Sequence, residues 1–272
     1  MTNEKAKARL LHTDSHLNGN TFRSERISLL NNRITHNEEN AYECILSLES
    51  YAVANGISNW FNKGDLKSLK NWFYVRGKLD YIVKNSPYNN SPIEVAVHRV
   101  LTGMYYLISD HSDLIKWYSN IDKDFDEKSV EDTKSENYWT QQFFLALRCE
   151  WDTLIDRCER ILVAPPTSSR EKKFIPDYKF YLALAKGNVS EMEKIIKELV
   201  TPKLISNRIA LEDGYTADLI CSPAIIYSKL AWRSGYEIVV DSPYIPKEWL
   251  PIAPLTSYED PFVFMRNYSI PA

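Results

Sequence analysis

The clearest candidate for metal chemistry in this chain is the acidic run Asp122-x-Asp124-x-Asp126, whose alternating carboxylates resemble the start of a calcium-binding loop. The rest of such a loop is missing, because Glu127 stands where the turn needs glycine. Thr133 also stands where a calcium loop needs a bidentate glutamate. We therefore predict no metal here. We interpret the run as part of a solvated acidic segment, with a partner-binding acidic patch as the alternative.

A second candidate for metal binding is the pair His12 and His16, whose i, i+4 spacing places both imidazoles on one face of a helix. No third ligand is near in the sequence, and the surrounding residues are polar. We therefore predict no zinc and interpret residues 1–20 as a disordered or loosely packed N-terminus. His98 lies inside an apolar helical pattern, which predicts a core or groove histidine rather than a catalyst.

Nucleophilic catalysis has no clear candidate in the sequence. Cysteines that are scattered through a long chain, without a C-x-x-C pair, are typical of reduced core residues in a cytoplasmic protein. They are Cys44, Cys149, Cys158 and Cys221. A nucleophile elbow, an H-E-x-x-H zinc motif and a P-loop are absent from the sequence. We therefore predict no enzymatic activity, no catalytic residues and no cofactor.

Composition narrows the classes of partner. The net charge of −3 gives no basic surplus for nucleic acid, so no nucleic-acid partner is expected. Basic residues within 63–78 lie among aromatic residues and could bind a single strand, but an amphipathic helix is the favoured interpretation. The first twenty residues lack an apolar signal-peptide core, and no apolar run is long enough to span a bilayer. A cytoplasmic protein with no membrane partner is expected.

Signals for helices recur along the chain. Capping-box patterns, in which a hydroxyl precedes glutamate by three residues, begin at Thr35, Ser91, Ser168 and Ser190. Gly56, Gly187 and Gly235 stand where helix stops are expected. Apolar residues at helical spacing predict helices near residues 22–33, 36–55, 64–85, 92–109, 111–120, 136–149, 152–163, 170–186, 190–200 and 223–234. The sequence therefore predicts an all-α, multi-helix bundle.

The second half of the chain carries a faint internal repeat. Phe144-Leu-Ala-Leu147 and Tyr181-Leu-Ala-Leu184 are each followed by an apolar pair and a proline at the same distance. This pattern predicts two stacked, tetratricopeptide-like helical hairpins, with two merely similar helix pairs in a bundle as the alternative.

Composition also predicts how the chain is divided. After residues 1–20, we expect an N-terminal helical half at 21–120, an acidic linker at 121–136 and a C-terminal helical half at 137–272, packed as one compact unit. Prolines from Asp241 onward prevent a long helix, and interleaved aromatic residues indicate an extended, proline-rich C-terminal strap.

The segment after Ser222 resembles the closing segment of the immunity protein 49 family. The matching features are the late helix with Leu230-Ala231, its stop at Gly235, the β-branched Val239-Val240, and the exit Asp241-Ser242-Pro243-Tyr244-Ile245-Pro246. Members of this family neutralise bacterial toxins. The resemblance implies a cytoplasmic immunity protein that binds a cognate toxin domain and blocks or distorts its active site. The immunity family paired with DNA-cleaving contact toxins is a related possibility.

An acidic surface with aromatic anchors would attract and hold a toxin that has a basic cleft. The predicted partner-binding residues are Asp122, Asp124, Asp126, Glu127, Glu131 and Asp132, flanked by Tyr138 and Trp139. A concave face near Tyr178, Tyr181 and Glu191 is the alternative surface. A tetratricopeptide-like adaptor or chaperone that binds a peptide segment is the alternative function, and a helical enzyme or nucleic-acid binder is a third hypothesis. The sequence leaves the oligomeric state open.

Overall fold

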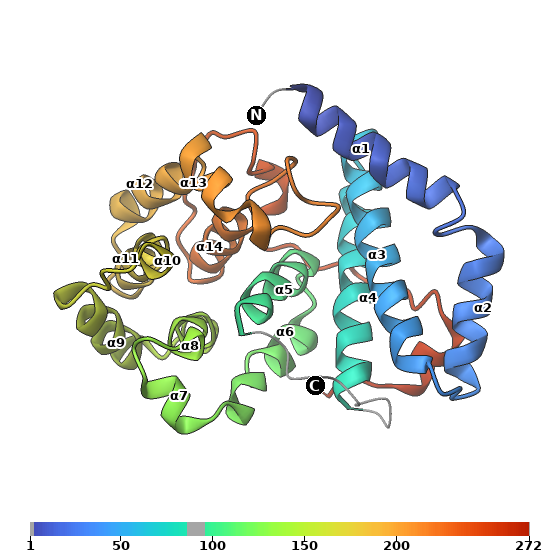
Figure 1. Ribbon diagram of the computed structural model, residues 1–272, viewed down its shortest axis with the longest axis horizontal. Helices are drawn as coiled ribbons and strands as arrows, with labels where there is room; N and C mark the ends of the chain where they lie inside the picture. Colours follow the sequence, from blue (N-terminus) through green and yellow to red (C-terminus); the bar gives the residue numbers. More distant parts are fainter. Residues whose placement is uncertain (1–2, 86–95, 272) are drawn as a thin grey trace.

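The chain folds into helices in the computed structural model, which describes residues 3–85 and 96–271 (Figure 1). No β-strand occurs in these two ranges, so the predicted all-α, multi-helix fold is confirmed. The β-branched run at 237–240 forms neither a helix nor a strand.

Four helices form the first group, on the right of Figure 1. They are α1 (Asn3–Asn18), α2 (Ser24–Thr35), α3 (Ala41–Lys63) and α4 (Leu66–Lys84). Helices α3 and α4 pack side by side, and α1 and α2 lie against α3. Gly56, which the sequence predicts as a helix stop, instead lies inside α3. A Cβ atom there would lie 2.8 Å from Cε1 of Phe73, so glycine permits the close approach of α4.

The N-terminus, predicted to be disordered or loosely packed, contains helix α1, so within the described residues 3–18 it is ordered. Its amphipathic pattern is weak and most of its side chains are exposed, so local sequence gives little signal for it. Contacts with distant parts of the chain hold it instead. Arg9 donates hydrogen bonds to the carbonyls of Gly214 and Ala217 at 2.7 and 3.1 Å, and Asp14 accepts one from Ser58 at 2.8 Å.

The middle of the chain connects the two groups of helices. It contains α5 (Ala96–Ser109), α6 (Ser112–Tyr118), the 3₁₀ helix η1 (Ile121–Asp124) and α7 (Glu127–Glu131). Helix α5 packs against α4 on one side and against α8 (Glu136–Leu147) and α14 (Ser222–Arg233) on the other. Gly103 makes the α8 contact possible, because a Cβ atom there would lie 2.4 Å from Cζ of Phe143.

The second group of helices lies on the left of Figure 1. Besides α8 and α14, it contains α9 (Trp151–Val163), α10 (Ser169–Lys172), α11 (Ile175–Ala185), α12 (Val189–Leu199), α13 (Pro202–Arg208) and the 3₁₀ helix η2 (Ile209–Leu211). Helices α8 and α9 pack as neighbours, and so do α11 and α12, with α9 against α11. The tetratricopeptide-like character of these pairs stays a prediction.

The structure confirms one of the predicted helix starts and contradicts two. Ser168 begins α10 as predicted, because its hydroxyl accepts a hydrogen bond from the Glu171 amide at 3.3 Å. The Ser190 prediction is wrong, because Asn188 caps α12 and Ser190 lies inside the helix. Thr35 ends α2 instead of starting a helix. The pattern that begins at Ser91 lies outside the described residues.

After α14 the described chain contains two 3₁₀ helices, η3 (Lys247–Trp249) and η4 (Val263–Asn267), and no α-helix. This segment returns to the first group, where η4 packs against α2 and α4 (Figure 1). Trp249 is fully buried against the aromatic rings of α3 and α4.

A buried charge cluster fixes this segment to the helices. Asp110, which follows α5, pairs with Lys70 of α4 and Lys229 of α14 at 2.7 Å each. The two ammonium groups also donate to the carbonyls of Ala253 and Pro251, at 2.6 and 3.2 Å. All three charged side chains are at most 2% exposed. The cluster therefore joins both groups of helices and the C-terminal segment at one point.

The apolar core is one continuous cluster that extends from Phe22 to Met265 and draws on both groups of helices. Among the described residues, no helix has the length and apolar character needed to cross a membrane.

Candidate functional site

The acidic segment predicted to bind a partner is folded, with η1 and α7 inside it. Asp126 caps α7, because its Oδ2 accepts a hydrogen bond from the Ser129 amide at 2.8 Å. Asn137 of α8 donates to the Ser129 hydroxyl at 2.7 Å, which ties α7 to α8. The segment is therefore held in place rather than acting as a free, solvated linker.

Asp122 anchors the segment to the core instead of facing a partner. It is 5% exposed. Its Oδ1 lies 2.7 Å from Nη1 of Arg148, and its Oδ2 accepts a hydrogen bond from Gln141 at 2.8 Å. The side chain of Asp124 lies outside the described residues. Because Asp122 is already paired, it adds little to the electrostatic field outside the protein.

Four of the predicted acids are exposed: Asp126, Glu127, Glu131 and Asp132. Glu131 is partly neutralised, because it pairs with Arg157 at 2.6 Å and Arg160 at 3.1 Å. Partial desolvation alone would raise the pKa of Glu131, but the two arginines outweigh it and lower the pKa below its ordinary value. The exposed acidic surface therefore rests mainly on Asp126, Glu127 and Asp132.

The two predicted aromatic anchors lie in the core. Tyr138 is fully buried, and its hydroxyl donates to the Arg157 carbonyl at 2.9 Å. Trp139 is 6% exposed, and its indole N–H donates to Asp177 at 2.9 Å. Their position on α8 explains this outcome, because that part of the helix faces α9 and α11. In this conformation neither ring flanks the acidic surface as expected, and only part of Trp139 reaches the surface of a pocket.

Asp177 is the carboxylate that accepts the hydrogen bond from the Trp139 indole. It is fully buried, and Arg208 pairs with it at 2.9 Å. Arg208 also donates to the Lys173 carbonyl and lies over the ring of Phe174, 5.5 Å from its centroid. A buried carboxylate is tolerated only when it is paired and hydrogen-bonded in this way. Nothing in the sequence pairs Asp177 with Trp139 or Arg208, so this support was not predicted.

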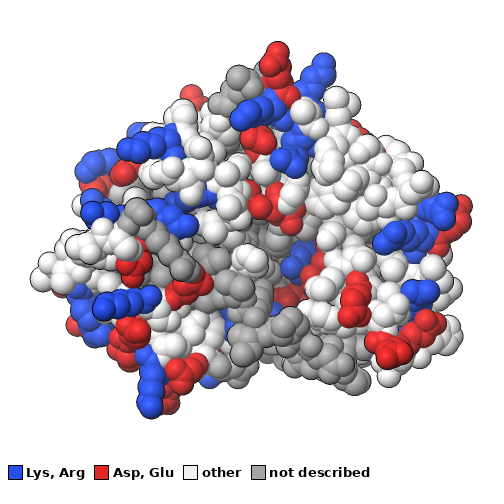
Figure 2. Space-filling view, viewed as in Figure 1, with Lys and Arg blue, Asp and Glu red and all other residues white. Residues whose placement is uncertain are grey.

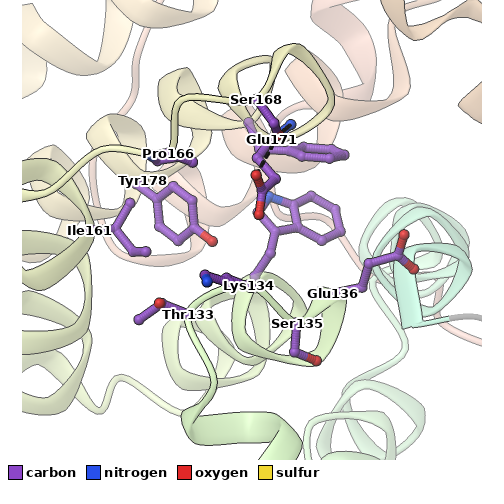
Figure 3. Close-up of a pocket in the computed structure, with 11 residues that line it drawn as sticks. Thr133, Lys134, Ser135, Glu136, Ile161, Pro166, Ser168, Glu171 and Tyr178 are labelled. Carbon is purple, nitrogen blue, oxygen red and sulfur yellow. Dashed lines mark hydrogen bonds between the residues drawn. The ribbon is translucent and has the colours of Figure 1, made fainter.

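A pocket of about 380 Å³ opens beside the acidic surface (Figure 3). It is lined by Thr133, Lys134, Ser135, Glu136, Trp139, Ile161, Pro166, Ser168, Glu171, Phe174 and Tyr178. Ile161 and Tyr178 face it from α9 and α11, while Glu171 and Lys134 approach it from opposite sides (Figure 3). The walls are thus aromatic and aliphatic with a few charges, which is typical of a site that takes a side chain or small ligand.

This pocket was not predicted from the sequence. The sequence named Trp139 and Tyr178 for two different surfaces and placed Ser168 and Glu171, whose side chains are hydrogen-bonded to each other, at the start of a helix, but nothing in it brought these residues together. Tyr178 and Tyr181, proposed for the alternative concave face, are both buried, whereas Glu191 is half-buried and pairs with Lys194 at 3.0 Å.

The arrangement offers no metal site among the described residues, because no group of three or more His, Cys, Asp or Glu side chains could hold an ion there. His16 hydrogen-bonds the Tyr215 hydroxyl at 2.9 Å, and His12 lies beside it with ring centroids 4.2 Å apart. Burial, and then the neighbouring His16, lower the pKa of His12. These histidines therefore serve the packing of α1.

Three of the four cysteines are buried as predicted. Burial raises the pKa of Cys158 to about 12, so this thiol carries no thiolate at neutral pH. Cys149 differs from the prediction, because it is exposed in the turn between α8 and α9 with a φ of 58°.

Comparison with known proteins agrees with the resemblance of the closing segment. Residues 134–249, from the end of the acidic segment to η3, match the family model described as immunity protein 49. The match includes all but the first of the residues that line the pocket beside Trp139. No curated protein and no solved structure matches the chain. Residues 134–249 are therefore similar to the immunity protein 49 family, in agreement with the resemblance of the segment after Ser222.

Proposed function

We propose that this protein is a cytoplasmic immunity protein that binds a cognate bacterial toxin domain and neutralises it by blocking or distorting the toxin's active site. The match of residues 134–249 to immunity protein 49 carries this proposal. The family also suggests a non-enzymatic role, in which a preformed surface does the work.

The structure supports a binding role at the acidic surface and the pocket next to it. Asp126, Glu127 and Asp132 are exposed, and the pocket begins at Thr133. Both are held by buried interactions, those of Asp122 and Trp139. A rigid surface loses little conformational entropy on binding, and its acids would increase the rate of encounter with a basic toxin surface.

The test is co-expression with each toxin domain that genome sequencing finds encoded beside this protein's gene. Wild-type protein should restore growth and co-purify with the toxin. We expect Glu127→Lys with Asp132→Lys to slow association by about tenfold or more at low salt, because steering charges act mainly on the association rate. Glu237→Lys with Glu248→Lys is the matched control, since both glutamates are exposed and remote from the segment.

The outcomes of this experiment distinguish the proposed immunity role from the proposed acidic binding surface. Growth inhibition that wild-type protein does not relieve would contradict the immunity role. Rescue together with equal association rates for both charge-reversed proteins would keep that role but remove the acidic surface from it.

A further inference from the structure

A second pocket, of about 350 Å³, lies where the two groups of helices meet. Its walls come from α4 and α5 on one side and from η2, the two residues that follow it and the start of α14 on the other. Acidic side chains are visible in the middle of the molecule, between the two groups (Figure 2). The residues that matter for its chemistry are Arg76, His98, Tyr105, Glu212 and Asp213. None of them belongs to the acidic surface described above.

The charges in this pocket are unbalanced. Arg76 forms an ion pair with Glu49, in which Nη1 and Oε1 lie 2.9 Å apart. Glu212 and Asp213 have no ion pair among the residues that the structure describes, and His98 is exposed at the edge of the pocket. Two adjacent carboxylates therefore face this region without an ion-pair partner in the described chain, and Arg76 and Arg9 act on Asp213 only from a longer range.

Glu212 has a structural role. Its Oε1 accepts a hydrogen bond from the Ser222 amide at 2.8 Å, and its Oε2 accepts one from Thr216 at 3.0 Å. It thereby satisfies a free amide at the start of α14. The Asp213 side chain accepts a hydrogen bond at only one of its two carboxylate oxygens within the described chain. Its Oδ1 accepts a hydrogen bond from the Tyr215 amide at 2.8 Å, whereas its Oδ2 has no partner in the described part of the chain.

Tyr105 supplies an independent observation. Its side chain lines the pocket and is only 6% exposed, yet its hydroxyl has no hydrogen-bond partner among the described residues. The ring is fixed by edge-to-face contact with Phe73, with centroids 4.9 Å apart. The ring is thus held in place while the hydroxyl stays accessible from the pocket, where a hydrogen-bond donor that enters can reach it.

The electrostatic environment agrees with this view. Desolvation is the main cause that raises the pKa of both Glu212 and Asp213, and the neighbouring Asp213 raises that of Glu212 further. Burial, and then Asp213, also raise the pKa of Tyr105. Arg76 and Arg9 oppose this shift at the exposed Asp213 without forming an ion pair with it, and a cation within hydrogen-bond distance of its Oδ2 would oppose it further.

We propose that this pocket receives a basic side chain, lysine or arginine, of the toxin, held by Asp213 Oδ2 and by the Tyr105 hydroxyl. This inference rests on the proposed function. The cation would donate to the free carboxylate oxygen and to the phenolic oxygen. The volume suits one long side chain rather than a helix or a strand. Because the pocket joins both groups of helices, its occupant would contact both at once.

The test uses the toxin domain identified by the co-expression experiment above and two conservative variants. Asp213→Asn keeps an oxygen for the Tyr215 amide, and Tyr105→Phe removes a hydroxyl that makes no hydrogen bond within the described chain. Neither should lower the unfolding temperature. Each should raise the Kd for the toxin by about tenfold or more, as expected for a hydrogen bond to a charged group.

The controls remove the same groups elsewhere. Asp241→Asn removes a carboxylate that is 92% exposed, and Tyr244→Phe removes a buried phenol in the segment between α14 and η3. Both should bind the toxin like wild type. Replacing the lysines and arginines of the toxin one at a time by alanine should identify one whose loss is not additive with Asp213→Asn.

The outcomes distinguish this inference from the proposed function. Tight binding by wild type with unchanged Kd values for both pocket variants would exclude the pocket from the interface. Weaker binding by both variants without coupling to any basic residue of the toxin would exclude a lysine or arginine as the occupant. Absence of binding by wild type would overturn the proposed function, and this inference with it.

Discussion

Replacing Asp110 by asparagine should destabilise the protein strongly, because one carboxylate balances two buried ammonium groups. Its oxygens lie 2.7 Å from Nζ of Lys70 and of Lys229. Asparagine has nearly the same shape and tolerates the left-handed backbone of this position, where φ is 58°. The substitution therefore removes the charge with little change in packing or backbone strain.

The magnitude follows from the burial of the cluster. No side chain in it is more than 2% exposed, so solvent does not screen the lost interactions. Removing one partner of a buried ion pair costs about 3–5 kcal/mol. The backbone carbonyls of Pro251 and Ala253 still accept from the two ammonium groups, so we place the loss near the middle, at about 4 kcal/mol. For a protein of this size, that corresponds to a fall in Tm of about 10 °C.

Urea unfolding followed by circular dichroism would measure the loss, with Asp241→Asn as the exposed control. The double variant of Asp110→Asn with Lys229→Met should recover part of the stability, because it removes one of the two uncompensated charges. A loss below about 1 kcal/mol, in the range of an exposed pair, would refute the reasoning. Simple additivity of Asp110→Asn and Lys229→Met would refute it as well.

The same cluster predicts a dependence on pH. Burial lowers the pKa of Lys229 to about 8 from 10.5, although Asp110 opposes the shift. Between these two values the unfolded chain binds more protons at this residue than the folded protein does. Stability should therefore rise with pH in this window. The Lys229→Met variant should lack this component of the rise, and an identical pH profile for both proteins would contradict the assignment.

Three further predictions concern other contacts. Gly103→Ala should destabilise the protein by about 1–3 kcal/mol in urea unfolding, because the new methyl group meets the ring of Phe143; an unchanged midpoint would contradict this close approach. Trp139→Phe should cost about 1–3 kcal/mol in the same assay, because Asp177 loses a buried donor, and a neutral result would mean that water replaces it. In the native protein only Cys149 should react quickly with iodoacetamide, with all four cysteines reacting in urea; fast labelling of a second native thiol would contradict the burial of the other three.

The sequence predicted the fold well where the signal is local. The expected helices at 64–85 and 223–234 correspond to Leu66–Lys84 and Ser222–Arg233, because apolar spacing and end signals lie within each segment. Helix α1 was missed because it depends on Arg9 and Asp14 contacting residues far along the chain. Asn188 was missed as a cap because a serine pattern two residues later competed with it.

The candidate site was less predictable, because composition does not specify whether a side chain points into the core or toward solvent. Asp122 and Asp126 belong to one acidic run, yet the first is buried against Arg148 and the second is exposed. Tyr138 and Trp139 follow this run closely, but the phase of α8 directs both into the core. The pocket and the junction between the two groups are built from segments distant in sequence, so only the folded chain places Tyr105 near Asp213.

The position of the Asp110 cluster also has a consequence for synthesis. Lys70 and Asp110 leave the ribosome long before Lys229 and Ala253, which complete their hydrogen bonds. A nascent chain that has reached α13 therefore lacks the second ammonium group and the backbone partners of the first. The first group of helices also lacks the buried ring of Trp249 and the packing of η4 until then, so it reaches its final stability only when the C-terminal segment docks. The buried cluster therefore makes the stability of the N-terminal helices depend on the segment of the chain that is synthesised after α13.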